Sequence, residues 1–341
     1  MDLLSSDLIY QGVYFVVLNL GKALAAPLIM QSELYWVYLF SGFSIAWLVW
    51  KLYLVRHASR EASATFRQNF FSRDIWWHPS AKVDYKFYVL NALLMAWFSS
   101  HIWVSEQTVA SWLQTLWPSS STSQATDSLA APHILNRVAF TLLFFMAYDF
   151  GRFVAHSMLH DISWLWEFHK VHHSAEVLTP LTAFRVHPLD LIVMAWIPAV
   201  FTGLVSWAYA FWVDPSVTFF TFMGFHVLVW LFNLVDHLRH WHVWVSYGPT
   251  LNPWLISPAH HQLHHSAQPE HWGVNRGYEL AIWDCLYGTF LEPSVKPMDF
   301  PKGLGDGTDG QWHTLGALFL RPITALFAAT LARIKPQRLR S

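Results

Sequence analysis

Fifteen of the twenty histidines lie between His156 and His271, and eight of them form three closely spaced groups. The groups are HSMLH with His156 and His160, HKVHH with His169, His172 and His173, and HQLHH with His261, His264 and His265. Spacings of three and four residues place side chains on one face of a helix. Neutral imidazole binds zinc, copper, iron and nickel, whereas crowded protonated imidazoles would repel one another. The pattern therefore predicts a polyhistidine metal centre.

The number of these histidines indicates more than one metal ion. Eight imidazoles exceed what one tetrahedral or octahedral ion can use, so two ions with roughly four or five imidazoles each are the simplest interpretation. The ligands would be almost entirely nitrogen, unlike the carboxylate-rich di-iron sites of four-helix bundles. Metal-bound imidazoles are usually oriented by carboxylates behind them. The candidates for that role are Asp149, Glu167, Asp236 and Asp284.

The composition is typical of an integral membrane protein. Of the 341 residues, 54% are hydrophobic and only 13% are charged, against about 25% charged in soluble chains. The net charge of −1 gives no indication of a nucleic-acid partner. A single cysteine, Cys285, excludes an internal disulfide and a cysteine-based zinc cluster. The N-terminus lacks a basic region before its apolar residues, so we expect no cleaved signal peptide.

Six apolar stretches are candidates for membrane-crossing helices, which need about 20 mostly apolar residues. They lie near 10–30, 35–54, 86–104, 136–155, 190–212 and 216–235. The last two are separated by Asp214-Pro215, and we expect a helical hairpin that returns to the side from which it entered. Lys22 lies inside the first stretch, so an interfacial helix with a snorkelling lysine is an alternative there.

The charges of the connecting segments predict the orientation in the membrane. Residues 55–86 carry Arg56, Arg60, Arg67, Arg73, Lys82 and Lys86, whereas 105–135 carry no lysine or arginine and include the run PSSSTSQATDS. The positive-inside rule places the first segment in the cytoplasm. All three histidine groups and the basic tail, with Arg333, Lys335, Arg338 and Arg340, then reach the cytoplasmic side. The predicted fold is all-α: a polytopic membrane helical bundle with a cytosolic histidine-rich helical cap.

The order HxxxH, HxxHH, HxxHH among transmembrane hairpins resembles the fatty acid hydroxylase/sterol desaturase superfamily of membrane di-iron oxygenases. Further matching words are YDFGRFVAHSMLH, LWEFHKVHHSAEVLTPLTAFRVHP, LRHWHVW, SPAHHQLHHS and NRGYELAIWDCLYGTF. The resemblance covers about 145–291. It implies an N-terminal transmembrane region over 1–135 and a catalytic domain over 136–295. The remaining 296–341 would be a C-terminal tail with an amphipathic or interfacial helix.

The resemblance also implies a ligand set. The histidines that match the iron ligands of the family are His156, His160, His169, His172, His173, His261, His264 and His265. His240, in LRHWH, matches the isolated histidine that precedes the last group. His237, His242 and His187 are further candidates, and Asp236 lies four residues before His240. One departure is Ser157, which stands where an arginine often follows the first histidine.

Two iron ions with open positions bind dioxygen, so the resemblance implies O₂-dependent hydroxylation of a lipid C–H bond. Lipid or sterol desaturation begins with the same hydrogen abstraction and is the alternative. The sequence has no dinucleotide fingerprint, flavin domain or haem domain. We therefore expect a separate electron donor: a reductase, a ferredoxin or a b-type cytochrome. The expected location is a bacterial inner membrane or the endoplasmic reticulum.

Two other classes of protein use membrane-embedded metal sites. A metal transporter would hold its ion near the bilayer midplane within broken helices. A zinc hydrolase would carry a general base in its motif, as in HExxH, and no HExxH is present. Both remain more distant alternatives to the oxygenase.

Overall fold

The structure is a computed structural model that describes residues 2–30, 32–57, 70–118 and 131–334, which are mostly helical. The N-terminal elements are α1 (Asp2–Leu24), η1 (Ala26–Leu28), α2 (Trp36–His57), α4 (Arg73–Trp76), α5 (Pro79–His101) and α6 (Glu106–Leu116). The central elements are α7 (Ala131–Asp161), α8 (Ser163–His173), η2 (Pro180–Phe184), α9 (Pro188–Trp212), β1 (Thr221–Phe222), β2 (Phe225–His226) and α10 (Val227–Asp236). The chain ends with α11 (Pro258–His264), η3 (Pro269–His271), α12 (Ile282–Tyr287) and α13 (Leu315–Ile334). The predicted helical character is therefore confirmed.

Two helices among the described residues are long and apolar enough to cross a membrane. They comprise His133–Asp161 within α7 and Pro188–Trp212, which is α9, with 29 and 25 residues. At about 1.5 Å per residue, both exceed the roughly 30 Å hydrocarbon core of a bilayer. They coincide with the predicted stretches 136–155 and 190–212 and indicate a membrane protein. The full multi-pass arrangement and its orientation stay predictions.

Three other predicted stretches are helical with shifted ends. Helix α2 covers 36–54 of the predicted 35–54. Helix α5 begins before the predicted 86–104 and ends at His101, and α1 ends at Leu24, where the short η1 follows. Several residues used for the orientation lie outside the described part of the chain. They are Arg60, Arg67, Lys335, Arg338, Arg340 and all but the first residue of the serine-rich run.

The prediction of a helical hairpin over 190–235 is wrong in its second arm. Residues 221–226 form a two-stranded hairpin, β1–β2, that turns through Met223 and Gly224 at positive φ. The preceding Val217, Thr218, Phe219 and Phe220 are β-branched and aromatic residues that favour extended backbone. The helix that follows, α10, has only 10 residues. At about 15 Å it is too short to cross a bilayer.

Helices α7 and α9 approach each other closely at Gly151 of α7, which has no side chain. A Cβ atom added at Gly151 would lie 2.6 Å from Cα of Pro198 in α9. The Cα of Pro198 is a backbone atom, and a Cβ has no rotamers, so only a shift of the two helices could relieve this clash. Gly151 therefore sets the spacing of the two helices, one turn before His156.

Replacing Gly151 with alanine should destabilise the protein by about 1–3 kcal/mol, because the added methyl group overpacks the α7–α9 contact. Thermal unfolding of the purified protein in detergent measures this loss. Gly12→Ala is the matched control, since a Cβ at Gly12 meets nothing within 4 Å. Because alanine has a higher helix propensity than glycine, Gly12→Ala should raise the free energy of unfolding by roughly 1 kcal/mol or less. Equal melting temperatures for the two variants would contradict the close contact.

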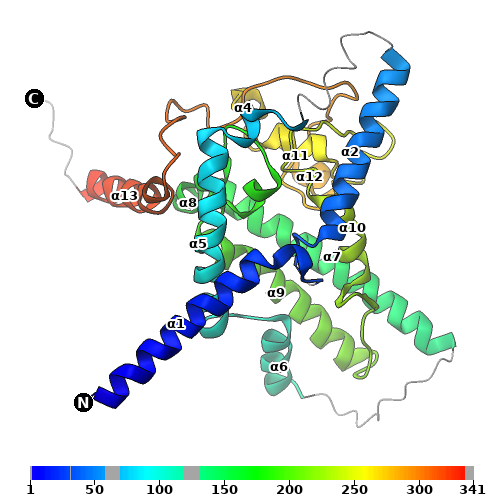
Figure 1. Cartoon of the computed structure of the whole chain (residues 1–341). Coiled ribbons are helices and arrows are strands. Elements are labelled where there is room, and N and C mark those ends of the chain that lie inside the picture. Colours follow the sequence, from blue (N-terminus) through cyan, green and yellow to red (C-terminus); the bar gives the residue numbers. More distant parts are fainter. Residues whose placement is uncertain (1, 31, 58–69, 119–130, 335–341) are drawn as a thin grey trace, which may run out of the picture.

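The histidine-bearing elements gather at one end of α7 and α9, where α8, α11 and α12 lie together (Figure 1). The fully buried Arg185 fixes α8 in this region. Its guanidinium donates to Asp84 Oδ1 at 2.9 Å, to Ser174 Oγ at 2.8 Å, and to the carbonyls of Val171 and Trp312. These bonds join the end of α8 to α5 and to the segment before α13. The position of His172 and His173 therefore depends on this buried arginine.

Candidate metal centre

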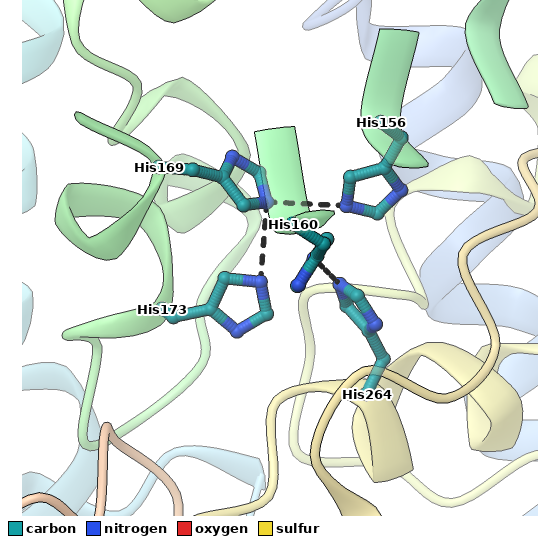
Figure 2. Close-up of side chains that lie close together, drawn as sticks. All are labelled: His156, His160, His169, His173 and His264. Atoms are coloured by element: carbon teal, nitrogen blue, oxygen red, sulfur yellow. Dashed lines mark hydrogen bonds between the residues drawn. The ribbon is translucent and has the colours of Figure 1, made fainter. Parts of the chain in front are cut away.

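The structure brings all nine histidines of the predicted ligand set into two adjacent groups. In each group, one ring nitrogen per residue lies within 4.8 Å of every other. The five-histidine group comprises His156, His160, His169, His173 and His264, and Figure 2 shows their rings turned toward a common centre. The four-histidine group comprises His172, His240, His261 and His265. Two groups of this size fit the two ions predicted from the number of histidines.

Each HxxHH motif contributes to both groups. In α8, His169 and His173 are four residues apart and face the five-histidine group, whereas His172 faces the other. In and just after α11 the division is reversed, because His261 and His265 join the four-histidine group and His264 joins the five-histidine group. Residues four apart share a helical face, and the third histidine points to the neighbouring face. The two groups are therefore neighbours on the same pair of helices.

The ring tautomers in the five-histidine group are set by hydrogen bonds on the outer nitrogens. His156 Nδ1 lies 2.7 Å from the carbonyl of Arg276, and His264 Nδ1 lies 2.7 Å from the carbonyl of Val274. A carbonyl only accepts, so each Nδ1 carries the proton and each Nε2 presents a lone pair. His169 Nδ1 lies 2.6 Å from Asp190 Oδ2, which favours the same tautomer.

The lone pairs meet at the centre of this group. His156 Nε2 lies 3.1 Å from His169 Nε2, and His160 Nε2 lies 3.3 Å from His264 Nε2. For His156 and His169 both nitrogens are acceptors in the tautomers just derived, so their approach is unfavourable without a cation between them. The donor set and its outer hydrogen bonds therefore fit a bound metal ion.

The four-histidine group has the same convergent geometry. His261 Nε2 lies 2.8 Å from His240 Nε2, and His240 Nε2 lies 3.2 Å from His172 Nε2. His265 Nε2 completes the group at 3.1 Å from His261 Nε2. His240, the isolated histidine between α10 and α11, is thus central to this group.

Burial keeps these histidines neutral. It lowers the pKa of His169 to about 3. The pKa values of His172, His173, His261 and His264 also fall well below 6.5, mainly through burial and further through repulsion by neighbouring imidazoles. Lone pairs are therefore available for a metal at neutral pH.

Of the four carboxylates predicted to orient the histidines, two bind backbone N–H groups and two form ion pairs. Asp149 accepts from the N–H groups of Glu279 and Leu280 and from the indole of Trp283. Asp284 accepts from the N–H groups of Arg276 and Gly277 at 2.7 Å each. Asp284 thereby holds the Arg276 carbonyl that binds His156. Asp236 pairs with Arg239 at 3.3 Å, and Glu167 pairs with Lys170 at 3.0 Å.

Several histidines outside the two groups cap helices. His187 Nδ1 accepts from the N–H of Leu189 at the start of α9, and His226 Nδ1 accepts from Leu228 at the start of α10. His260 Nδ1 accepts from the N–H of Ser257 before α11. Of the further candidate ligands, His187 therefore caps the start of α9. His237 Nε2 lies 2.6 Å from the carbonyl oxygen of Glu33. The third, His242, contacts the ring of Phe70 at a tilt and the ring of Trp241 edge-on.

Another small cluster joins His78, Glu176 and His313 at the start of α5. His313 Nε2 lies 2.9 Å from Glu176 Oε1, and His78 Nδ1 accepts from the N–H of Ser80 as the cap of α5. His78 Nδ1 is thus already occupied, and all three side chains are half-buried. We interpret the cluster as a contact that holds the segment before α13 against α5.

Sequence reasoning missed two residues that shape the centre. Asp190 lies three residues after His187 in the first turn of α9 and binds His169. Arg185 fixes the end of α8. The word RVHPLD contains both residues, but an acidic residue at a helix start is usually accounted for by the helix dipole alone. Their partners lie in other segments, so spacing gives no signal for them.

Two cavities reach the histidines. The larger, about 710 Å³, is lined by His156 and His169 of one group and by His172, His240 and His261 of the other. Apolar side chains of α5 and α9 form much of its wall, namely Ala92, Met95, Leu191, Met194, Ala195, Pro198 and Ala199. A second cavity of about 370 Å³ touches only the five-histidine group, through His160, His173 and His264. A cavity with apolar side chains along much of its wall and a smaller cavity therefore both reach the centre.

Comparison with known proteins points to one family. Residues 141–289 match the family model described as fatty acid hydroxylase. Alkylglycerol monooxygenase of Xenopus tropicalis is 31% identical over 158 residues, which are 45% of this chain and 31% of that protein. Ornithine lipid hydroxylase OlsE of Rhizobium tropici is 31% identical over 148 residues, 42% of this chain and 40% of that protein.

Human cholesterol 25-hydroxylase is 28% identical over 164 residues, 48% of this chain and 54% of that protein. The chain thus spans between 31% and 54% of the length of these three relatives. No solved structure matches it significantly.

Proposed function

Because the chain belongs, through residues 141–289, to the fatty acid hydroxylase/sterol desaturase superfamily, we propose that it is an O₂-dependent di-iron membrane oxidoreductase that hydroxylates a lipid C–H bond. The observation that supports this most directly is the pair of converging histidine groups at an apolar cavity. The names of the relatives, which are lipid hydroxylases and monooxygenases, agree with lipid oxidation.

In this proposal, the nine histidines of the two groups hold two iron ions. When bound, the iron supplies the activation of dioxygen and the oxidising power that zinc lacks. The overall change is R–H plus O₂, two electrons and two protons giving R–OH and water. The electrons come from a separate donor, which we propose is a reductase, a ferredoxin or a b-type cytochrome.

The side chains of the protein have three tasks in this reaction. His156 and His264 hold their Nδ1 protons on backbone carbonyls, so that Nε2 stays a lone-pair donor. The apolar wall of α5 and α9 binds the hydrocarbon and excludes water from the centre. The histidines that line the large cavity would hold the metal centre next to the bound hydrocarbon.

Desaturation is the second candidate, because it uses the same centre and the same first hydrogen abstraction. We propose that the substrate enters from the bilayer and that the histidine groups lie on the cytoplasmic side, as the positive-inside rule predicts. A transporter or zinc hydrolase would need neither dioxygen nor an electron donor.

The test is metal analysis of the purified protein combined with untargeted lipid analysis of cells with and without it, under air and under low oxygen. We expect about two irons per chain, one for each histidine group, and an oxygen-dependent lipid that gains one oxygen atom. A loss of two hydrogens would identify a desaturase. Zinc in an iron-replete preparation, with no oxygen-dependent lipid change, would contradict the proposal.

A further inference from the structure

The smaller cavity has no task in the proposed lipid oxidation. It encloses about 370 Å³, and its wall includes three members of the five-histidine group, His160, His173 and His264. Four further side chains of the wall are polar, namely Lys170, Ser266, Arg276 and Asp306. The five-histidine group therefore lies between two cavities, with His156 and His169 facing the large one.

The smaller cavity lies almost wholly outside the two helices that are long enough to cross a membrane. Its wall comes from α8, from the end of α11, from the residues on either side of η3, and from the start of the glycine-rich segment 303–310. Helix α7 contributes only His160, its next-to-last residue. An ion can therefore reach this cavity from water without entering the hydrocarbon core, where an unpaired charge is costly.

The smaller cavity also contains the most accessible ligand of the centre. His160 is half-buried, whereas the other eight histidines of the two groups are buried. Its ring centroid lies 5.1 Å from that of Trp166, and its Nε2 lies 3.3 Å from His264 Nε2 (Figure 2). Trp272, another residue of the wall, is 53% exposed. The cavity thus leads from the surface of the protein to the ring of His160.

The charges beside this cavity do not oppose the approach of a cation. Lys170 pairs with Glu167 at 3.0 Å and lies 4.0 Å from Asp306. Arg276 pairs with Asp161 at 2.8 Å. The two cations that line the cavity therefore have three carboxylates beside them. Asp306 is exposed, so its carboxylate can attract a hydrated divalent cation from solution.

The glycine-rich segment gives the cavity a fixed wall on this side. The carboxylate of Asp309 accepts hydrogen bonds from the N–H groups of Leu304 and Gly305, at 2.8 and 2.9 Å. Gly305 has a φ of +63°, and a Cβ atom there would clash with the carbonyl oxygen of Ala267. The backbone of the segment therefore packs closely against the residues that follow α11. This packing holds Asp306 at the mouth of the cavity.

We propose that the smaller cavity is the entrance through which a divalent metal ion passes from water to the five-histidine group. The ion meets the carboxylate of Asp306 first and then exchanges its water for the imidazoles of His160, His173 and His264, which line the inner part of the route. This inference rests on the metal centre of the proposed function and is independent of lipid oxidation.

The test measures how fast metal-free protein takes up Co²⁺ when the mouth of the cavity is blocked reversibly. Asp306→Cys in a Cys285→Ser background offers one exposed thiol, which is converted to a methyl or a naphthyl mixed disulfide. His172→Ala is added so that the five-histidine group alone binds the ion. The naphthyl label should slow uptake roughly tenfold or more relative to the methyl label, because it closes the entry path. Reduction of the disulfide should restore the rate.

The matched control is the naphthyl label on the native Cys285 of the His172→Ala protein. Cys285 is exposed and lines neither of the two cavities, so its label should leave the rate unchanged. Each comparison uses one folded protein with a removable label, so a folding defect cannot imitate the effect. The affinity for Co²⁺ at equilibrium should stay the same, since a blocked entrance changes only the rate.

Equal uptake rates with the methyl and naphthyl labels on the Asp306→Cys variant would overturn the entrance. Failure of the unlabelled protein to bind Co²⁺ would overturn the metal centre itself, and the entrance with it. A protein that takes up Co²⁺ through this cavity but oxidises no lipid would support the entrance and contradict the proposed function.

Discussion

Alanine at His264 or at His172 is expected to abolish lipid oxidation while leaving the protein folded, and each substitution should remove a different iron ion. His264 belongs to the five-histidine group and His172 to the four-histidine group. Each substitution removes one nitrogen ligand and leaves a gap that water can enter. The remaining imidazoles then no longer hold the ion in a dry site. Iron should fall from about two per chain to about one in either variant, because each group holds its own ion.

Iron analysis, Mössbauer spectroscopy and oxygen-dependent turnover on the same preparations would measure this effect. His133→Ala is the appropriate control, since His133 is exposed at the far end of α7 and belongs to neither group. His313, which also belongs to neither group, is less suitable because it contacts Glu176. Full activity with two irons in the His172 variant would remove that residue from the ligand set.

Eight of the nine histidines of the centre could be predicted from local spacing, whereas His240 was predicted only from the resemblance to the family. Histidines three and four residues apart in HKVHH and HQLHH must share a turn of helix, and packing alone rarely gathers three such motifs in one chain. The two apolar helices α7 and α9 could be predicted for a similar reason, since a long and mostly apolar run in a bilayer satisfies its backbone hydrogen bonds as a helix.

The division of the nine histidines between two groups could not be predicted, because it depends on how α8 and α11 face each other. His172 and His173 are neighbours in the chain but belong to different groups. The second arm of the expected hairpin was predicted wrongly because hydropathy does not distinguish a helix from the aromatic extended segment before Met223 and Gly224.

The contact between Asp190 and His169 gives the second large expected effect. Oδ2 of Asp190 accepts a hydrogen bond from the Nδ1–H group of His169, with 2.6 Å between the two atoms, and both side chains are buried. Asp190→Asn removes the negative charge and can present an amide N–H to Nδ1, which favours the tautomer with its proton on Nε2. Loss of such a carboxylate typically lowers metal affinity or activity roughly 10–100-fold. We expect that loss in iron affinity, measured by competition with a chelator, and a parallel loss of turnover.

Asp214→Asn is the matched control for this substitution, since Asp214 follows the other end of α9 and binds Ser216. It should keep the iron affinity of the wild-type protein. A general loss of folding would lower the melting temperature of the metal-free Asp190→Asn protein as well, whereas an effect through His169 leaves the metal-free protein intact and weakens only the loaded state. Wild-type iron affinity in a folded Asp190→Asn variant would show that the imidazole keeps its orientation without the carboxylate. In that case the Arg276 and Val274 carbonyls, which fix His156 and His264, would be sufficient to set the geometry of the five-histidine group.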